Sequence, residues 1–185
     1  MFVNIIVVYE RNLGIGLNNS LPWKISSDLK KFKELTIGNK KNGIIMGKNT
    51  WLSLNKKSLI FRDNLILSKT LTIDEEDKNN NITKSFKNEK DLKEFIDKKN
   101  YEELWIIGGA NIYDLFLNKT NILKINKIYV TLIDEEIECD TFFPLLNKSS
   151  YSFMSKSIHN SYNKEYNIYD IIYKNNGNKV VKANE

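Results

Sequence analysis

The chain has 185 residues, of which 41% are hydrophobic and 11% aromatic, and this is typical of one globular domain rather than a disordered segment. Its net charge is +5, but the basic residues are nearly all lysines spread along the chain, without the basic and aromatic stripe typical of nucleic-acid binding. No apolar run reaches the roughly 18 residues of a membrane span, and the single cysteine, Cys139, excludes an internal disulfide and favours a reducing, cytosolic compartment.

The pattern of hydrophobic residues predicts an α/β fold, with apolar β-branched runs as strands and amphipathic runs as helices. The predicted strands are 3–9, 42–47, 64–68, 103–109, 124–133, 151–158 and 166–173. The predicted helices are 26–36, one that starts at Thr50, 89–99 and 111–117. The polar stretch DEEDKNNNITK, residues 74–84, is predicted to be a surface excursion.

The order of these elements also predicts how they are arranged. The strands of the first half are almost continuously apolar, which favours a buried parallel sheet covered by helices. The last two strands are joined by a polar loop and predict an antiparallel hairpin at the edge of the sheet. We expect a single domain over residues 1–185, with 173–185 as a polar tail or the start of a linker.

One carboxylate is out of place in the first predicted helix. Ser26 is a candidate N-cap residue, and the apolar positions are Leu29, Phe32 and Leu35. Asp28 falls on the same apolar face, and no Lys or Arg stands at a spacing that would obviously pair with it. Such a carboxylate is costly unless a ligand supplies donors. The alternative is that Asp28 only complements the helix dipole.

Two strand-to-helix turns carry glycine, Gly47 in IIMGKNTW and Gly108–Gly109 in WIIGGANIY. Backbone N–H groups at a helix N-terminus attract phosphate, so two such turns favour a ligand with several phosphates. The alternative is that these glycines serve backbone geometry alone. The dinucleotide fingerprint G-x-G-x-x-G is absent from the sequence, which argues against an ordinary Rossmann domain.

The scarcity of histidine and cysteine limits the chemistry. With one histidine, His159, and one cysteine, a zinc site built from Cys and His is excluded. His159 lies in SIHNSYNKEY, which is predicted to be a solvated polar connection. Acid–base chemistry is therefore expected to depend on carboxylates, tyrosine or water.

Six stretches resemble dihydrofolate reductases in their order and spacing, over about residues 3–173: RNLGIGLNNSLPWKISSDLKKF, IIMGKNTW, NLILS, WIIGGANIY, YVTLI and DTFFP. The resemblance implies a three-layer sandwich around a mostly parallel eight-stranded sheet, with a C-terminal antiparallel hairpin and four helices. It also implies NADPH-dependent reduction of 7,8-dihydrofolate, by hydride transfer to C6 and protonation of N5. The alternatives are a reductase of the same fold that acts on a pyrimidine of riboflavin synthesis, and a binding module without activity.

The resemblance assigns roles to named residues. Asp28 would accept two hydrogen bonds from the pterin ring, Thr131 would support this carboxylate, and Trp23 would help to hold an ordered water. Arg62 matches the arginine that binds the α-carboxylate of the glutamate tail, although its surroundings, SLIFRDN, lack the proline and glycine usual in the family. The implied substrate site consists of Val7, Val8, Asp28, Leu29, Phe32, Leu54, Arg62, Ile107, Tyr113 and Thr131.

The resemblance also implies an NADPH site and no metal site. Its expected residues are Val8, Ile15, Gly16, Asn19, Leu21, Gly47, Lys48, Asn49, Thr50, Leu67, Ser68, Lys69, Ile107, Gly108, Gly109, Ala110, Asn111, Ile112 and Tyr113. Ser68 and Lys69 resemble the partners of the adenosine 2′-phosphate, and together with Lys48 they favour NADPH over NADH. The loop 10–23 resembles the mobile segment that closes over the nicotinamide.

The expected ligands are therefore dihydrofolate and antifolate inhibitors, and neither nucleic acid nor membrane is expected as a partner. The expected location is the cytoplasm. In some members of this family the domain is fused to thymidylate synthase. The terminal segment KNNGNKVVKANE would serve either as a frayed terminus or as the start of a linker, and the sequence leaves both open.

Overall fold

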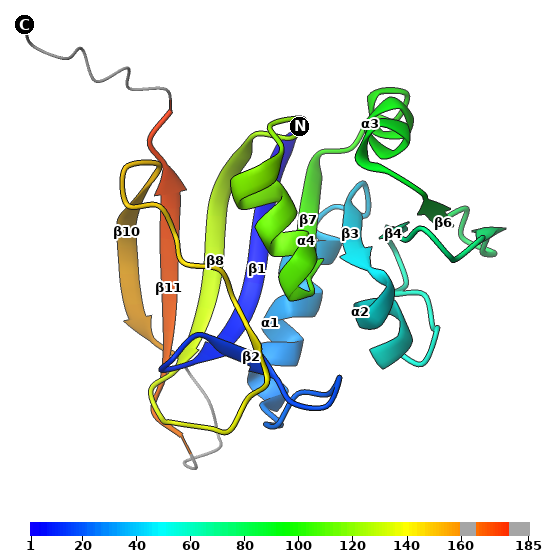
Figure 1. The fold of residues 1–185 in the computed structure, drawn as a ribbon. Coiled ribbons are helices and arrows are strands. Elements are labelled where there is room, and N and C mark those ends of the chain that lie inside the picture. Colours follow the sequence, from blue (N-terminus) through cyan, green and yellow to red (C-terminus); the bar gives the residue numbers. More distant parts are fainter. Residues whose placement is uncertain (160–165, 178–185) are drawn as a thin grey trace, which may run out of the picture.

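The computed structural model describes residues 1–159 and 166–177, and in this part of the chain a nine-stranded sheet lies between two layers of helices (Figure 1). The helices are α1 (Ser26–Ile37), α2 (Lys48–Ser53), α3 (Glu89–Asp97) and α4 (Ala110–Asp114), the last continued by a π-helical turn over Leu115–Lys119. The strands of the large sheet are β1 (Phe2–Glu10), β3 (Gly43–Gly47), β4 (Asp63–Leu67), β5 (Asp74–Glu76), β6 (Ile82–Phe86), β7 (Glu103–Gly108), β8 (Ile125–Ile133), β10 (Tyr151–Ile158) and β11 (Ile168–Asn175). Two short strands, β2 (Gly14–Gly16) and β9 (Thr141–Phe142), pair separately.

The strand order is β10-β11-β8-β1-β7-β3-β4-β6-β5. Neighbours from β8 to β6 are parallel, whereas β11, β10 and β5 pair antiparallel at the two edges. The predicted mostly parallel sheet with a C-terminal hairpin is confirmed. The number of eight strands implied by the resemblance is wrong, because the sheet has nine. The pattern of hydrophobic residues predicted seven of them and missed β5 and β6, which arise from the region expected to be a surface excursion. Backbone pairing of β6 with β4, from Asn64↔Thr83 to Leu67↔Phe86, outweighs the polar composition there.

The core forms three clusters, and the two larger ones lie on opposite faces of the sheet. Val3, Ile5 and Val7 of β1 join the cluster that includes residues of α3 and α4. Ile6, between them, belongs to the cluster that includes Trp51 of α2 and side chains of α1. Because successive side chains of a strand point to opposite faces, this division places helices on both sides of the sheet. The three-layer arrangement is confirmed.

Helix α1 differs from its prediction in two details. It begins at Ser26 with Ile25 in the N-cap position and no side-chain cap, so the expected capping role of Ser26 is wrong. Leu29, expected on the buried face, is 54% exposed. The most buried positions of the helix are Asp28 and Thr36. Leu29 follows Asp28 directly and is therefore turned about 100° from it around the helix axis.

The C-terminal strand extends to Asn175, so residues 173–175 of the predicted tail belong to β11. Residues 160–165, in the predicted polar connection, and residues 178–185 lie outside the described residues. Within the described ranges, no helix combines the length and the apolar character that a membrane crossing requires.

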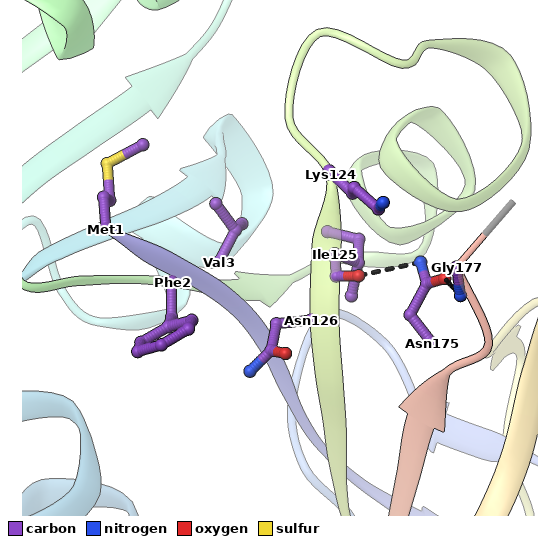
Figure 2. Close-up of a pocket in the computed structure, with 8 residues that line it drawn as sticks. All are labelled: Met1, Phe2, Val3, Lys124, Ile125, Asn126, Asn175 and Gly177. Atoms are coloured by element: carbon purple, nitrogen blue, oxygen red, sulfur yellow. Dashed lines mark hydrogen bonds between the residues drawn. The ribbon is translucent and has the colours of Figure 1, made fainter.

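A hollow of about 350 Å³ opens at the amino ends of β1 and β8 (Figure 2). Its lining residues are Met1, Phe2, Val3, Lys124, Ile125, Asn126, Asn175 and Gly177. The Asn175 amide donates to the Ile125 carbonyl at 2.8 Å across this hollow. Parallel α/β sheets bind their ligands at the carboxyl ends of the strands, and this hollow is at the opposite end. We therefore do not regard it as the functional site.

Candidate functional site

The predicted motifs meet at the carboxyl ends of the central strands, where β1 and β7 part. The two strands pair from Phe2↔Glu103 to Ile5↔Ile106 and no further, although β7 continues to Gly108. In contrast, β1 stays paired with β8 to its end, through Val8↔Thr131. A point where neighbouring parallel strands separate is the usual ligand position in open α/β sheets.

Asp28 lies in the first turn of α1 above this point and is 9% exposed. Thr131 Oγ1 of β8 donates a hydrogen bond to Asp28 Oδ1 at 2.7 Å. Burial raises the pKa of the Asp28 carboxyl, and this effect is opposed by the Thr131 hydrogen bond and the positive charge of Lys31. Among the described residues no cation forms an ion pair with Asp28. The structure therefore brings Asp28 and Thr131 together around a desolvated carboxylate.

Tyr113 of α4 closes the site from the other side of β1. Its hydroxyl donates to the Ile6 carbonyl at 2.8 Å, and the side chain is buried. Burial and the negative charge of Asp28 raise the pKa of Tyr113, so its hydroxyl stays protonated. The Asp28 carboxylate and the Tyr113 hydroxyl are therefore close enough to influence each other electrostatically.

A cation stands close to Asp28 without pairing with it. Lys31 Nζ donates to Thr131 Oγ1 at 3.0 Å and to Asp170 Oδ1 of β11 at 2.5 Å. Lys31 follows Asp28 by three residues on the same helix, a spacing at which side chains are neighbours. The prediction that no Lys stands at a suitable spacing was incomplete, because it overlooked this pair.

His159 extends the same group of polar side chains. Its Nδ1 lies 2.9 Å from Asp170 Oδ1, and its Nε2 lies 2.9 Å from Ser27 Oγ. His159 is 7% exposed, so the prediction of a solvated loop histidine is wrong. Its partners come from β11 and α1, and nothing in the local sequence could have indicated them.

Arg62 precedes β4 and is 3% exposed. Its guanidinium donates to Thr36 Oγ1 and lies 5.6 Å from the centre of the Phe32 ring, while its Nε has no partner. Burial lowers the pKa of Arg62 to about 10, which leaves it charged at neutral pH. No carboxylate of the described residues pairs with it. Arg62 is thus a buried cation with spare donors.

The remaining predicted wall residues are divided between core and surface. Val7 is buried with the α3 and α4 cluster, and Val8 packs against Trp23 and Ile25. Phe32, Leu54 and Ile107 are partly buried against the Trp51 cluster, whereas Leu29 is exposed.

The two glycine turns lie next to each other, because Met46 is the register partner of Gly108. A Cβ on Gly47 would lie 2.9 Å from Ile112 Cγ1, and a Cβ on Gly108 would lie 2.9 Å from the Tyr113 ring. Gly108 also has φ +107°, and the Gly108–Gly109 peptide is cis. Neither α2 nor α4 has a side-chain cap, so their first N–H groups are left to other partners. Thr50, Ala110 and Asn111 lie in the first turns of these helices.

Polar side chains continue past the end of β4, where Leu67 is its last residue. Ser68 Oγ accepts from the N–H groups of Thr70 and Leu71 at 3.2 and 3.1 Å, and it is buried. Lys48 Nζ donates to Thr70 Oγ1 at 3.0 Å. Lys69 is exposed and lies in the same turn, between the hydroxyl-bearing residues Ser68 and Thr70.

The loop 10–23 contains β2 and borders α2. Asn49 Nδ2 donates to Asn19 Oδ1 at 3.4 Å, which connects the loop to the turn after Gly47. Ile15 is half-buried and Gly16 buried, whereas Leu21 is 55% exposed. The loop ends at Trp23, which is buried, and Trp23 Nε1 has no hydrogen-bond partner among the described residues.

Comparisons with known proteins agree with this geometry. A family model described as dihydrofolate reductase matches residues 2–175. A dihydrofolate reductase of Buchnera aphidicola subsp. Baizongia pistaciae is 34% identical over 174 residues, which are 94% of this chain and 96% of that protein. A bifunctional dihydrofolate reductase-thymidylate synthase 2 of Arabidopsis thaliana is 36% identical over 155 residues, which are 80% of this chain and 27% of that protein. A solved dihydrofolate reductase from Enterococcus faecalis, complexed with NADP(H) and RAB-propyl, superimposes with a TM-score of 0.76 at 23% identity, over 95% of this chain and 96% of that one.

Proposed function

Because the chain belongs to the dihydrofolate reductase family, we propose that Asp28 holds and orients the pterin ring of the substrate. The enzyme reduces 7,8-dihydrofolate to 5,6,7,8-tetrahydrofolate with NADPH. One observation carries the proposal: Asp28 is buried and ionisable, and Thr131 is its single hydrogen-bond partner among the described residues. A desolvated carboxylate with free lone pairs is completed by a ligand that brings donors.

The hydrogen bonds of Asp28 define what it can bind. Thr131 donates to Oδ1, so Oδ2 and a second lone pair of Oδ1 are free. The 2-amino group and the neighbouring ring nitrogen of the pterin can donate to these positions as a pair. Two parallel charge-assisted hydrogen bonds fix the orientation of a planar ring as well as its affinity.

The residues of the two glycine turns fit NADPH. The absence of side chains at Gly47 and Gly108 brings two uncapped helix N-termini together, and such N–H groups suit a pyrophosphate. Ser68 and Lys69, with Lys48 nearby, would hold the 2′-phosphate. When bound, NADPH supplies the hydride for C6 of the substrate.

The proton for N5 needs another donor than Asp28, which would hold the other end of the ring. Tyr113 is a poor candidate, since burial raises its pKa and its hydroxyl donates to Ile6. Trp23 Nε1 is a buried donor without a protein partner. This supports a role of Trp23 in holding an ordered water that delivers the proton.

The glutamate tail of the substrate would contact Arg62. A buried guanidinium with an unpartnered Nε suits a carboxylate, because its planar donors match two carboxylate oxygens. We infer that Arg62 binds the α-carboxylate of the glutamate tail, with Phe32 packed beside both groups.

The variant Asp28→Asn tests the central proposal. We expect kcat/KM to fall roughly a thousandfold, as on loss of one strong transition-state contact. The assay follows loss of nicotinamide absorbance with dihydrofolate and NADPH, and circular dichroism confirms folding. Asp97→Asn removes the same charge from an exposed position of α3 and is expected to leave the activity unchanged. Near-normal turnover of folded Asp28→Asn would exclude the assignment.

We also infer a cytosolic location and inhibition by antifolates that compete with dihydrofolate. The single free cysteine, Cys139, supports a reducing compartment. Association with thymidylate synthase is supported by the bifunctional relatives, and co-purification of the two activities from the native source would test it.

A further inference from the structure

Lys31 has two carboxylates within reach and pairs with only one of them. It lies one helical turn after Asp28 on α1, yet its ammonium contacts Asp170 Oδ1 at 2.5 Å and Thr131 Oγ1 at 3.0 Å. Thr131 in turn donates to Asp28 Oδ1 at 2.7 Å. The Thr131 hydroxyl therefore separates the cation from Asp28.

The sheet fixes the position of Asp170. Asp170 of β11 and Thr131 of β8 are register partners, so their side chains leave the sheet on the same face, toward α1. His159, just after β10, approaches both oxygens of Asp170 at 2.9 and 3.0 Å through Nδ1. Its Nε2 lies 2.9 Å from Ser27 Oγ, beside Asp28 in the chain. Asp170 is thus held from two sides.

We propose that Asp170, oriented by His159, is a positioning residue that draws the Lys31 ammonium away from Asp28 and so keeps the Asp28 carboxylate open for the pterin. Without Asp170, the Lys31 ammonium is free to turn to Asp28, because the two residues are three apart on one helix and their side chains are neighbours. An ion pair between them would occupy the oxygens that the ring must reach. This proposal rests on the proposed role of Asp28 as the pterin-binding group.

The charges around Asp28 agree with this role. Lys31 faces it from its own helix, Asp170 from β11, Tyr113 from α4 and His159 from the hairpin. Lys31 and His159 lower the pKa of Asp28 and Asp170 raises it by less, so Asp170 offsets part of the positive charge near Asp28. The Asp28 carboxylate is then available to accept hydrogen bonds from a ligand.

The first test combines two substitutions. We expect Asp170→Asn to raise the KM for dihydrofolate about five- to tenfold, the size of a competing ion pair of about 1 kcal/mol. Adding Lys31→Met to this variant removes the competing cation, and we expect the KM to return toward the parent value. If Asp170 were merely structural, the double variant would be as impaired as Asp170→Asn or more so, and this result would overturn the proposal.

The second test is the pH dependence of kcat/KM. In Asp170→Asn the released Lys31 ammonium should lower the apparent pKa of Asp28, whereas Lys31→Met should raise it. Loss of the Asp170 charge alone would also lower the pKa of Asp28, so the decisive comparison is the size of the Lys31→Met shift in the two backgrounds. We expect a larger shift in Asp170→Asn than in the parent, because the released ammonium lies closer to Asp28, and an equal or smaller shift would contradict the proposal. If Asp170→Asn does not fold in a thermal melt, an unchanged pKa in Lys31→Met alone overturns it.

The outcome separates this proposal from the assignment of Asp28 itself. Near-normal turnover of Asp28→Asn would remove the basis of both. A severe defect in Asp28→Asn, together with a parental KM and pH profile in Asp170→Asn, would contradict only the positioning role.

Discussion

The proposed substrate side and the proposed cofactor side of this enzyme carry their charges differently. On the substrate side, Asp28 and Arg62 are 9% and 3% exposed, and each retains hydrogen-bonding capacity that no described residue fills. On the cofactor side, Lys48 and Lys69 are exposed. A buried charge costs several kcal/mol unless it is met, whereas an exposed one costs little. Conservative substitutions should therefore have larger effects on the substrate side than on the cofactor side.

After the loss expected for Asp28→Asn, the largest of these effects is expected for Arg62→Lys. An ammonium cannot form the paired hydrogen bonds of a guanidinium, so we expect the KM for dihydrofolate to rise roughly 10- to 100-fold with kcat little changed. Steady-state kinetics measures both constants. Arg11→Lys is the matched control, because Arg11 is half-exposed and pairs with Asp134. An unchanged KM in folded Arg62→Lys would show that the buried guanidinium is structural.

A smaller effect is expected on the cofactor side for Lys69→Ala. Loss of one exposed cation should reduce the preference for NADPH over NADH about five- to tenfold, since a charge-assisted bond to phosphate is lost. The ratio of kcat/KM for the two cofactors gives the answer. Lys90→Ala, at an exposed site of α3, serves as the control. A parental ratio would count against contact of Lys69 with the 2′-phosphate.

The smallest effect concerns stability. Burial raises the pKa of Asp28, so its ionised form destabilises the folded state at neutral pH. We expect Asp28→Asn to raise the Tm of the free protein by about 2–4 °C at pH 7, equivalent to about 1 kcal/mol. This gain should shrink as the pH falls toward about 3, below the unfolded pKa of about 3.9, where the parent carboxyl is mostly protonated in both states. Thermal melts at both pH values test it, and a lower Tm at pH 7 would contradict the account.

The strands that the sequence predicted best are those with long apolar runs. β1, β7 and β8 are buried on one or both faces, so their apolar residues follow directly from their position in the core. β5 and β6 were missed because the edge strand β5 is fully exposed and the neighbouring β6 has only two buried residues, Thr83 and Phe86. Their structure depends on pairing with neighbours, which a local pattern does not record.

The candidate site shows the same division. The contact of Thr131 with Asp28 agrees with the resemblance to the dihydrofolate reductases. Arg62 could be singled out in the sequence because the chain uses lysine at nearly every other basic position, but its burial is known only from the structure. The contact of His159 with Ser27 joins residues 132 positions apart, and a polar surrounding sequence favoured the wrong environment for it. Long-range polar contacts of this kind need the fold before they can be inferred.

The hairpin of β10 and β11 has a consequence for the dynamics of the substrate site. β10 is an outer strand that is exposed along nearly its whole length, yet its partner β11 supplies Asp170. Outer strands open locally at a lower free energy than central ones, and amide hydrogen exchange records such openings. Asp170 therefore holds the Lys31 ammonium only while β10 and β11 stay paired. A ligand seated on Asp28 would accordingly slow deuterium uptake in strands that it never touches.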